Sequence, residues 1–233
     1  MRPLRVASDW HLGPRAPARH GALALDFLRR AADEGAEVIL NGDVWEELFA
    51  GPGAGPRAFP EVAAAAAALA AAGRLRWTRG NHDPDAGVRR IELDWPGVGR
   101  VLVAHGDGAD PVSASAIGRL GDAVSRRFGR LGVVHGAAWL AERSVRLVAE
   151  ERMIAIFRER CERLVDEGGF ALGVFGHVHR AHLAPGDRYA NAGFLHGERL
   201  EYLELSPGGA RLAALGPAGP LPAAPASGPG GGA

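Results

Sequence analysis

Five short polar clusters, each placed directly after a run of apolar residues, constrain the fold of this chain more than any other feature. The clusters are Asp9-Trp10-His11, Asn41-Gly42-Asp43, Gly80-Asn81-His82-Asp83, His105-Gly106-Asp107 and Gly176-His177-Val178-His179. Each apolar run has the length and composition of a strand. In open α/β sheets, ligands bind where the carboxyl ends of the strands meet. The sequence therefore predicts a sheet protein whose polar clusters share one site at that edge.

The apolar runs alternate with helical patterns, which is typical of an α/β domain. Gly21–Glu34 and Phe59–Ala72 have helical character, whereas the Gly- and Pro-rich stretch 51–57 predicts a loop. The predicted strands are Leu4–Ser8, Val38–Leu40, Leu75–Thr78, Arg89–Leu93, Val101–Ala104, Ala171–Phe175, Leu200–Leu205 and Ala210–Ala214.

A helical insertion interrupts the α/β pattern, and we place it at residues 111–168. Val145–Val165 forms a long helical pattern in its second half. We expect residues 1–215 to form one domain around this insertion. Residues 216–233 are nearly all Gly, Pro, Ala and Ser, which predicts a disordered tail. The first half of the insertion carries an apolar stripe at helical spacing, formed by Ile117, Leu120, Val124, Phe128 and Leu131.

Charge and residue types exclude several functions. The 27 basic and 27 acidic residues balance, so there is no broad basic surface and we expect no nucleic-acid partner. Because every basic residue is Arg, a Walker-type phosphate loop and a Lys Schiff base are excluded. The single cysteine, Cys161, excludes a multi-Cys metal site, so a metal centre would use His and oxygen ligands. The sequence has no apolar stretch typical of a signal peptide or membrane anchor, and we expect a cytoplasmic protein.

The residue types in the clusters point to metal binding. On extended chain, residues two apart lie on one side, so Asp9 with His11, and His177 with His179, can each present two ligands to one place. A single cluster is equally compatible with a turn or with a hydrogen-bonded core histidine. Five clusters of carboxylate, imidazole and carboxamide groups at one site would be costly to bury unless they shared ions or water.

The order Asp-x-His, Gly-Asp, Gly-Asn-His-Asp, His-Gly-Asp, Gly-His-x-His resembles the calcineurin-like metallophosphoesterases, from Ser8 to His179. The resemblance implies an α/β fold, a four-layer αββα sandwich with the helical insertion as a cap, and two divalent metal ions. The implied ligands are Asp9, His11 and His179 for one ion, Asn81, His105 and His177 for the other, and Asp43 as the bridge between them.

The charge of such a site suits a phosphoester. Two divalent ions bring about +4 and the carboxylates of Asp9 and Asp43 bring −2, so about +2 remains to attract a phosphate and to lower the pKa of a bound water. Mixed oxygen and imidazole ligands fit Mn, Fe, Co or Zn, and of these we expect Mn. Asp83 and Asp107 are expected to support the ligands.

The resemblance implies that Asn81 and His82 contact the substrate, and that His82 is catalytic. His82 would stabilise the phosphoryl oxygens or protonate the leaving group. The alternative is that His82 only orients Asp83 or Asn81. Arg180 follows the last cluster and is a candidate for a phosphate contact, although an exposed Arg without a special role fits equally well.

Within the superfamily, the chain is similar to the UDP-2,3-diacylglucosamine pyrophosphatases of lipid A synthesis. The similarity lies in Ser8–Gly13, Gly42–Glu47, the insertion after His105–Gly108, and Tyr189–Phe194. It implies hydrolysis of UDP-2,3-diacylglucosamine to UMP and 2,3-diacylglucosamine 1-phosphate, with the insertion closing over acyl chains and a peripheral contact at the inner membrane. The chain departs from the best-known members, which carry Arg at the position of His82.

Two other functions use the same sequence features. A phosphodiesterase or phosphomonoesterase acting on a small soluble substrate of nucleotide type would need the metal site but no apolar cap. A scaffold without catalysis would keep the sandwich and lose metal ligands, yet every ligand that the resemblance implies is present. An apolar tunnel leading from the metals into the insertion would favour the lipid substrate over the soluble one.

Overall fold

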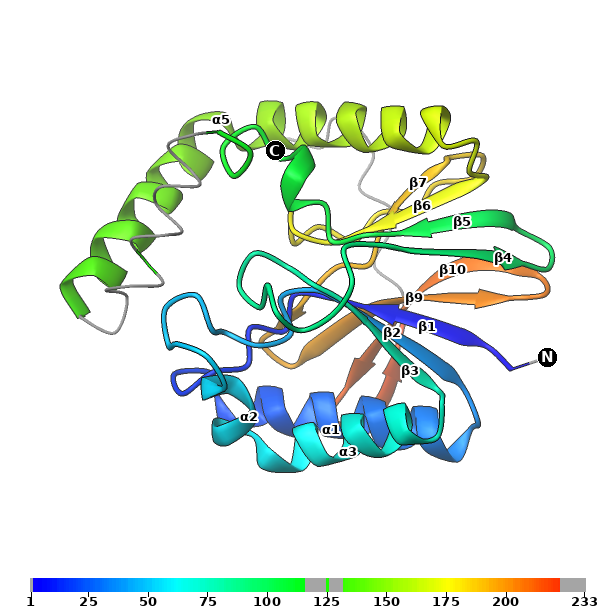
Figure 1. The fold of residues 1–233 in the computed structure, drawn as a ribbon, viewed down its shortest axis with the longest axis horizontal. Helices are drawn as coiled ribbons and strands as arrows, with labels where there is room; N and C mark the ends of the chain where they lie inside the picture. Colours follow the sequence, from blue (N-terminus) through cyan, green and yellow to red (C-terminus); the bar gives the residue numbers. More distant parts are fainter. Residues whose placement is uncertain (1, 116–124, 126–131, 223–233) are drawn as a thin grey trace.

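Two β-sheets pack face to face, and helices cover the outer face of each sheet (Figure 1). The computed structural model describes residues 2–115, 125 and 132–222, and residues 132–149 by their backbone alone. The predicted α/β class and the four-layer αββα sandwich are confirmed.

The first sheet combines parallel and antiparallel strands in the order β11-β10-β9-β1-β2-β3, with β8 beside β9. The strands β1, β2 and β3 pair in parallel, and β9 joins β1 in antiparallel register. The strands of this sheet are β1 (Leu4–Ala7), β2 (Glu37–Asn41), β3 (Leu75–Thr78), β8 (Leu195–His196), β9 (Arg199–Ser206), β10 (Gly209–Gly216) and β11 (Gly219–Leu221).

The second sheet has the order β4-β5-β6-β7. A hairpin joins β4 to β5, whereas β5, β6 and β7 run in parallel. Its strands are β4 (Ile91–Trp95), β5 (Gly99–Val103), β6 (Leu172–Phe175) and β7 (Tyr189–Asn191). The carboxyl ends of β1, β2, β3, β5 and β6 are each followed by one of the polar clusters.

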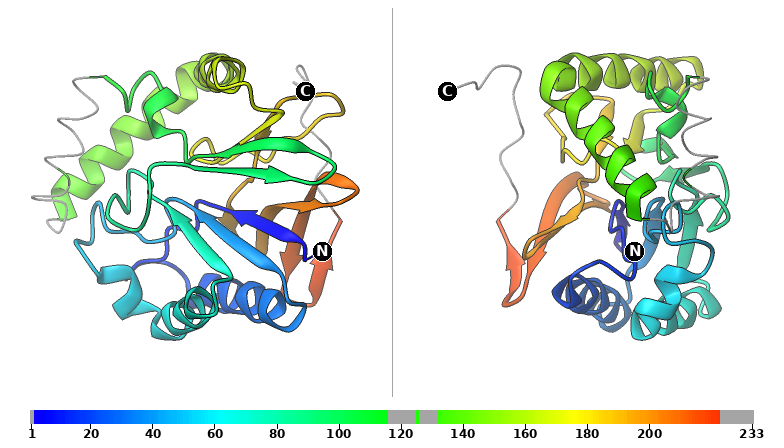
Figure 2. Two further views of the ribbon diagram at one scale, coloured as in Figure 1. Left: turned by 45° about the vertical axis from the view of Figure 1, so that its right-hand side comes forward. Right: turned by 90° about the vertical axis from the view of Figure 1, so that its left-hand side faces the viewer.

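Four helices and one 3₁₀ turn connect the strands in the described residues. Helices α1 and α3 lie against the first sheet, and α5 covers the second (Figures 1 and 2). The first half of α5 leaves the sheets at the end of the sandwich where the strands β1 and β2 finish. These elements are α1 (Ala18–Asp33), α2 (Ala54–Ala58), α3 (Pro60–Ala71), η1 (Asp107–Ala109) and α5 (Gly132–Glu167).

Alternation along the strands produces three cores. In β1, Leu4 and Val6 point between the two sheets, while Ala7 points to α1 and α3. In β6, Val174 likewise joins the core between the sheets, and Phe175 joins the core under α5. Such alternation follows from the two-residue period of a strand, and it allows one sheet to bury both faces.

The second half of α5 is the fourth layer. Its residues Phe157, Cys161 and Val165 are spaced by four, so they share one face of the helix and pack against the second sheet. This part of the insertion belongs to the sandwich itself. The apolar stripe predicted between residues 117 and 131 lies outside the described residues. Among the described residues, no helix is both long enough and apolar enough to cross a membrane.

Two expectations are wrong, one about a loop and one about where the expected disordered tail begins. The stretch 51–57 contains the short helix α2, in which a side chain at Gly55 would meet Trp45 and the carbonyl of Leu12, so close packing explains this glycine. The disorder expected from residue 216 does not begin there, because β11 pairs with β10. Ladder pairing uses backbone groups and needs no large side chains, and Pro220 is tolerated in an edge strand. Residues 223–233 lie outside the described part of the chain.

Candidate metal centre

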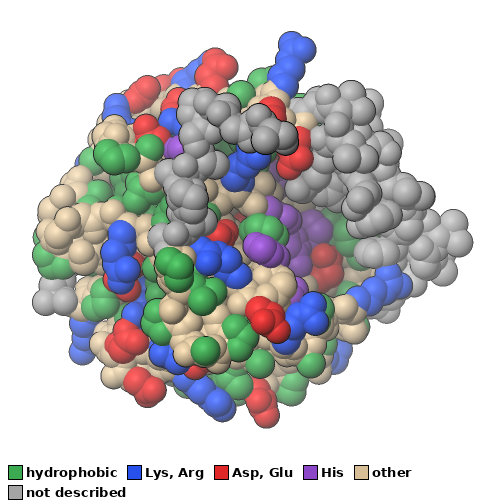
Figure 3. Space-filling view, turned by 180° about the vertical axis from the view of Figure 1, so that it is seen from behind, with side chains coloured by type: hydrophobic (Ala, Val, Ile, Leu, Met, Phe, Trp, Pro, Cys, Tyr) green, Lys and Arg blue, Asp and Glu red, His purple; other side chains and the backbone are tan. Residues whose placement is uncertain are grey.

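The structure brings the five polar clusters together at the carboxyl edge of both sheets, where histidine side chains gather in a hollow of the surface (Figure 3). Among the described residues, three overlapping groups have potential ligand atoms within 4.8 Å of one another. Six of the seven predicted ligands belong to these groups, and His82 joins one of them. The groups are Asp9 with His11 and His179, His11 with Asp43 and His82, and Asp43 with His105 and His177.

The first group places two imidazole rings against one carboxylate. The Nε2 atoms of His11 and His179 are 3.1 Å apart, and the same atom of His179 is 3.2 Å from Asp9 Oδ1. Two ring nitrogens at this distance repel each other when both carry lone pairs, so a proton or a cation must lie between them. A metal ion bound by all three side chains satisfies this requirement.

Two buried atoms that lack a hydrogen-bond partner belong to His105 of the third group and to Asn81, a predicted ligand of the same ion. His105 Nδ1 is 3.0 Å from the carbonyl of Asn41 and donates to it, so in the neutral ring Nε2 carries the lone pair. That Nε2 lies 3.1 Å from Asp43 Oδ2 but makes no hydrogen bond, and Asn81 Oδ1 is also buried without a partner. Each orphaned atom costs about 1–3 kcal/mol. Both belong to predicted ligands, so the residues present fit a bound divalent ion.

The backbone at the ligands is strained. Five residues other than glycine have positive φ in the described chain, and all five are predicted ligands. A left-handed conformation costs such residues about 1–2 kcal/mol each, and it persists where surrounding contacts fix it. The left-handed residues turn the chain directly after the strands, and the ligand side chains of the different clusters lie close together there. The five residues are Asp9, His11, Asp43, His177 and His179, with φ between 46° and 71°.

Asp83 holds two of the clusters together, as expected for a supporting residue. Its carboxylate accepts the backbone N–H groups of Asp43, Val44 and Trp45 at 2.8–3.1 Å, and that of Gly80 at 2.9 Å. A side chain at Gly80 would collide with Asp43, since its Cβ would lie 2.1 Å from Oδ1. Burial and the charge of Asp43 raise the pKa of Asp83 to about 6.

The two predicted acidic ligands are ionised at neutral pH. Burial raises the pKa of Asp9, but the charge of His105 and the hydrogen bond from His179 outweigh it, and the pKa falls to about 2. Burial also raises the pKa of Asp43, but the neighbouring charges of His105 and His82 outweigh it and hold this pKa well below its usual value. Ionised carboxylates are the form that binds divalent cations.

A family model for calcineurin-like phosphoesterases matches residues 3–181. The chain therefore belongs to the calcineurin-like phosphoesterase family. The family predicted from the order of the motifs is confirmed.

The chain is also similar to several curated proteins and solved structures. Proteins called UDP-2,3-diacylglucosamine hydrolase in Bordetella parapertussis and Bordetella pertussis are 36% identical to the chain over 122 residues. The match covers 45% of this chain, and the chain spans only 45% of each relative. A conserved protein of Streptococcus pneumoniae described as a predicted phosphoesterase aligns over 94% of this chain and 91% of its own, with 16% identity and a TM-score of 0.48. A dimetal phosphatase from Danio rerio aligns over 91% and 98%, with 12% identity and a TM-score of 0.48.

Two acidic residues that contact histidines of the candidate metal centre were missed by the sequence reasoning. Both oxygens of Glu46 lie within 3.0 Å of His82 Nδ1, and Oε2 is 3.6 Å from His11 Nδ1. Asp110 Oδ2 lies 3.2 Å from His177 Nε2. Burial raises the pKa of Glu46, but the charge of His82 and the hydrogen bonds from both rings outweigh burial and hold the pKa well below its usual value. The position of Glu46, three residues after Asp43, was a usable signal, whereas nothing in the sequence marked Asp110.

Arg180 lies at the rim of the site and is paired with α5. Its two terminal nitrogens are 3.0 and 2.8 Å from the oxygens of Glu151. This ion pair is exposed, so its contribution to stability is small. The predicted contact of Arg180 with a phosphate stays a prediction.

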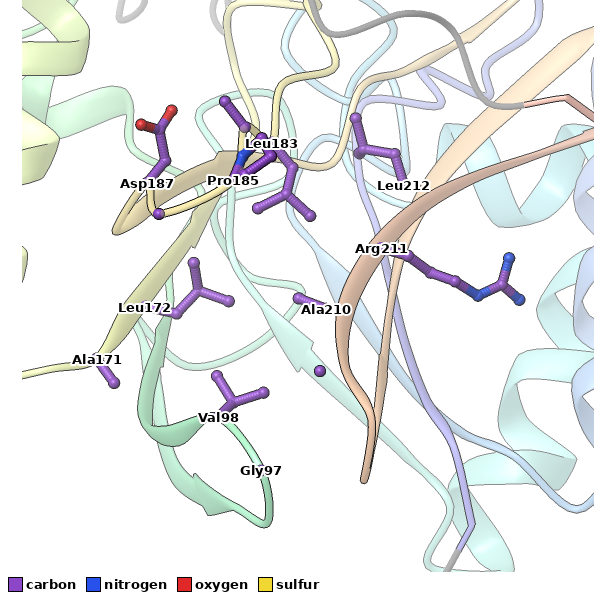
Figure 4. Close-up of a pocket in the computed structure, with 13 residues that line it drawn as sticks. Gly97, Val98, Ala171, Leu172, Leu183, Pro185, Asp187, Ala210, Arg211 and Leu212 are labelled. Carbon is purple, nitrogen blue, oxygen red and sulfur yellow. The ribbon is translucent and has the colours of Figure 1, made fainter.

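A separate pocket of about 630 Å³ lies where the β4–β5 and β9–β10 turns approach each other (Figure 4). Leu172, Leu183 and Leu212 line it, and none of the predicted site residues does. Its charged groups already have partners, because Asp187 accepts hydrogen bonds from Arg158 and His182, and Arg211 donates to Glu204. The pocket therefore offers apolar surface but no free charge to select a ligand.

Proposed function

We propose that this protein hydrolyses a phosphoric anhydride or ester with two divalent metal ions, and that its substrate is UDP-2,3-diacylglucosamine. The convergence of the predicted ligands on one edge of the sheets carries the metal-dependent part of the proposal. The names of the relatives support the substrate. The products would be UMP and 2,3-diacylglucosamine 1-phosphate.

The residues divide into two sets of ligands around one shared carboxylate. Asp9, His11 and His179 would hold one ion, and Asn81, His105 and His177 the other, with Asp43 between them. When bound, the ions would polarise the phosphoryl oxygens and lower the pKa of water to supply the nucleophile. We propose Mn²⁺ as the bound metal. Oxygen and imidazole ligands suit it, and they suit Fe, Co and Zn as well.

His82 would act on the phosphoryl group. Nδ1 donates to the carboxylate of Glu46, which fixes the orientation of the ring and assigns contact with the substrate to Nε2. The ring of His11 lies edge-on to that of His82, with centroids 4.6 Å apart, so the catalytic candidate stands beside a predicted ligand. From this position a protonated His82 can stabilise phosphoryl oxygens or give its proton to the leaving group.

The insertion would supply the lipid specificity. The first half of α5 extends past the sheets at the end where β1 and β2 finish (Figure 1), and the loops at that end carry the predicted ligands. It would therefore lie beside a substrate bound at the metal centre. We propose that acyl chains pack there, and that the enzyme works in the cytoplasm with a peripheral contact at the inner membrane. Each buried methylene would contribute about 0.8 kcal/mol.

The test compares two substrates under one condition. Metal-free protein is reloaded with Mn²⁺ and incubated with UDP-2,3-diacylglucosamine, measured by UMP release, and with bis(p-nitrophenyl) phosphate. We expect turnover of both and a much higher kcat/KM for the lipid. Asp43→Asn should abolish both activities, while Asp94→Asn, which changes an exposed Asp of β4, serves as the matched control. Turnover of the soluble diester alone would refute the lipid substrate, and turnover of neither would refute catalysis and favour a scaffold.

A further inference from the structure

Asp110 connects the predicted ligand His177 to the beginning of the insertion. One of its oxygens, Oδ2, lies 3.2 Å from His177 Nε2. The same oxygen accepts the backbone N–H of Ser113 at 3.0 Å and the Ser113 hydroxyl at 2.6 Å. Oδ1 accepts the N–H of Val112 at 3.2 Å, and the Asp110 carbonyl accepts that of Ala114. Asp110 therefore caps the turn that opens the insertion and at the same time contacts the metal centre.

This contact determines which nitrogen of His177 can face an ion. A carboxylate at 3.2 Å from Nε2 accepts a hydrogen bond, so Nε2 carries the proton and Nδ1 carries the lone pair. Phe157 and His105 further restrict the ring, with centroids 5.8 and 5.3 Å away. Metal-binding histidines commonly donate their second N–H to a carboxylate, which fixes the tautomer and strengthens the ligand.

We propose that Asp110 is a positioning residue that fixes the ring of His177 with Nδ1 toward the ion shared with Asp43 and His105. The inference rests on the metal site of the proposed function. It has a second consequence, because the same carboxylate also holds the turn 110–114. By linkage, an ion bound to His177 stabilises that turn, and a formed turn strengthens binding of the ion. The cap insertion would thus begin at a residue that responds to metal occupancy.

The experiment measures metal binding, without any substrate. Metal-free wild type, Asp110→Ala, Asp110→Asn and Ser113→Ala are titrated calorimetrically with Mn²⁺ alone. We expect two ions in every case. In Asp110→Ala one of the two sites, the one that contains His177, should lose about 10- to 100-fold in affinity, the usual loss when such a partner is removed. Asp110→Asn keeps an oxygen that accepts from His177 and should recover part of the loss. Ser113→Ala keeps the His177 contact but loses the hydroxyl bond that helps to hold the turn, so by linkage it should weaken the same site, and by less than Asp110→Ala does.

The tautomer of His177 gives an independent readout. In protein loaded with Zn²⁺ and labelled with ¹⁵N-histidine, we expect the His177 signal of the Nε2–H tautomer, and we expect Asp110→Ala to broaden or shift it. An Nδ1–H tautomer in the wild type would overturn the role of Asp110, and so would affinities of both sites in Asp110→Ala that stay within about twofold of wild type. Failure of the wild type to bind two ions would instead refute the metal centre on which the proposal depends. If Asp110→Ala fails to fold by circular dichroism, the wild-type tautomer decides.

Discussion

Replacing Glu46 with Gln should impair the step in which His82 acts, while leaving the metals in place. The two oxygens of Glu46 lie 3.0 and 2.9 Å from His82 Nδ1, and both side chains are largely shielded from solvent. A hydrogen bond to a charged group contributes about 1.5–3 kcal/mol. If this energy is lost in the transition state, kcat falls by about 10- to 100-fold, since about 1.4 kcal/mol corresponds to tenfold.

The assay is steady-state turnover of UDP-2,3-diacylglucosamine together with metal analysis of the same samples. We expect Glu46→Gln to lower kcat, to leave KM nearly unchanged and to retain two ions per chain. Glu47→Gln is the matched control, because Glu47 is the next residue and its carboxylate accepts the N–H of Gly53 at 2.7 Å instead of contacting a histidine. The control should keep wild-type turnover.

A double-mutant cycle shows whether Glu46 acts through His82. His82→Ala should keep both ions and lose about 10²–10⁴-fold in kcat, which is the usual contribution of a general acid or base. If Glu46 works only by orienting His82, adding Glu46→Gln to His82→Ala should cost little more. An equal loss in both backgrounds would refute the reasoning. So would loss of an ion in Glu46→Gln, which would mean that Glu46 acts through His11, 3.6 Å away.

Three further outcomes follow from the structure. Asp43→Ala should remove both ions and nearly all activity, which elemental analysis and UMP release would show. Excess EDTA should lower the Tm of the Mn²⁺-loaded protein by about 5–10 °C, because an ion present at 100 times its Kd contributes about 2.7 kcal/mol and each kcal/mol shifts the Tm of a chain this long by about 2–4 °C; an unchanged Tm would contradict binding to the native site. Phe157→Ala should destabilise the fold by about 3–5 kcal/mol in urea denaturation, because Phe157 is 1% exposed under α5, and a loss below about 1 kcal/mol would contradict its place in the core.

The sequence predicted the sheet elements well, because strand residues face two cores in alternation. The strand β3 has the predicted bounds, and β1, β2, β5 and β6 differ from theirs by at most two residues at either end. The last strand, β11, pairs with β10 through its backbone and has no alternation of apolar and polar side chains that would predict it. The strand β11 consists of Gly219, Pro220 and Leu221, of which only Leu221 has a large apolar side chain. Composition therefore suggested disorder, although hydrogen bonds to β10 order this segment.

The convergence of the ligands was predictable, but the means of orienting them was not. Alternating apolar runs place the clusters at one edge, whereas the positive φ of residues such as Asp43 and His177 depends on contacts formed only in the folded chain. Glu46 and Asp110 were missed for the same reason. Each of them touches a histidine from a different loop, at sequence separations of 36 and 67 residues.

The ligands also orient one another, which affects how variants of this site should be interpreted. The backbone N–H of His82 donates to Asp43 at 2.8 Å, and that of His177 donates to Asp9 at 3.0–3.1 Å. The cluster after β2 is thus held by the one after β3, and the cluster after β1 by the one after β6. Truncation of Asp9 or Asp43 to Ala removes a ligand and also releases the neighbouring loop, so the loss of metal has two causes. Asp→Asn keeps an oxygen that accepts the same N–H while removing the charge, and it therefore isolates the role of the carboxylate as a ligand.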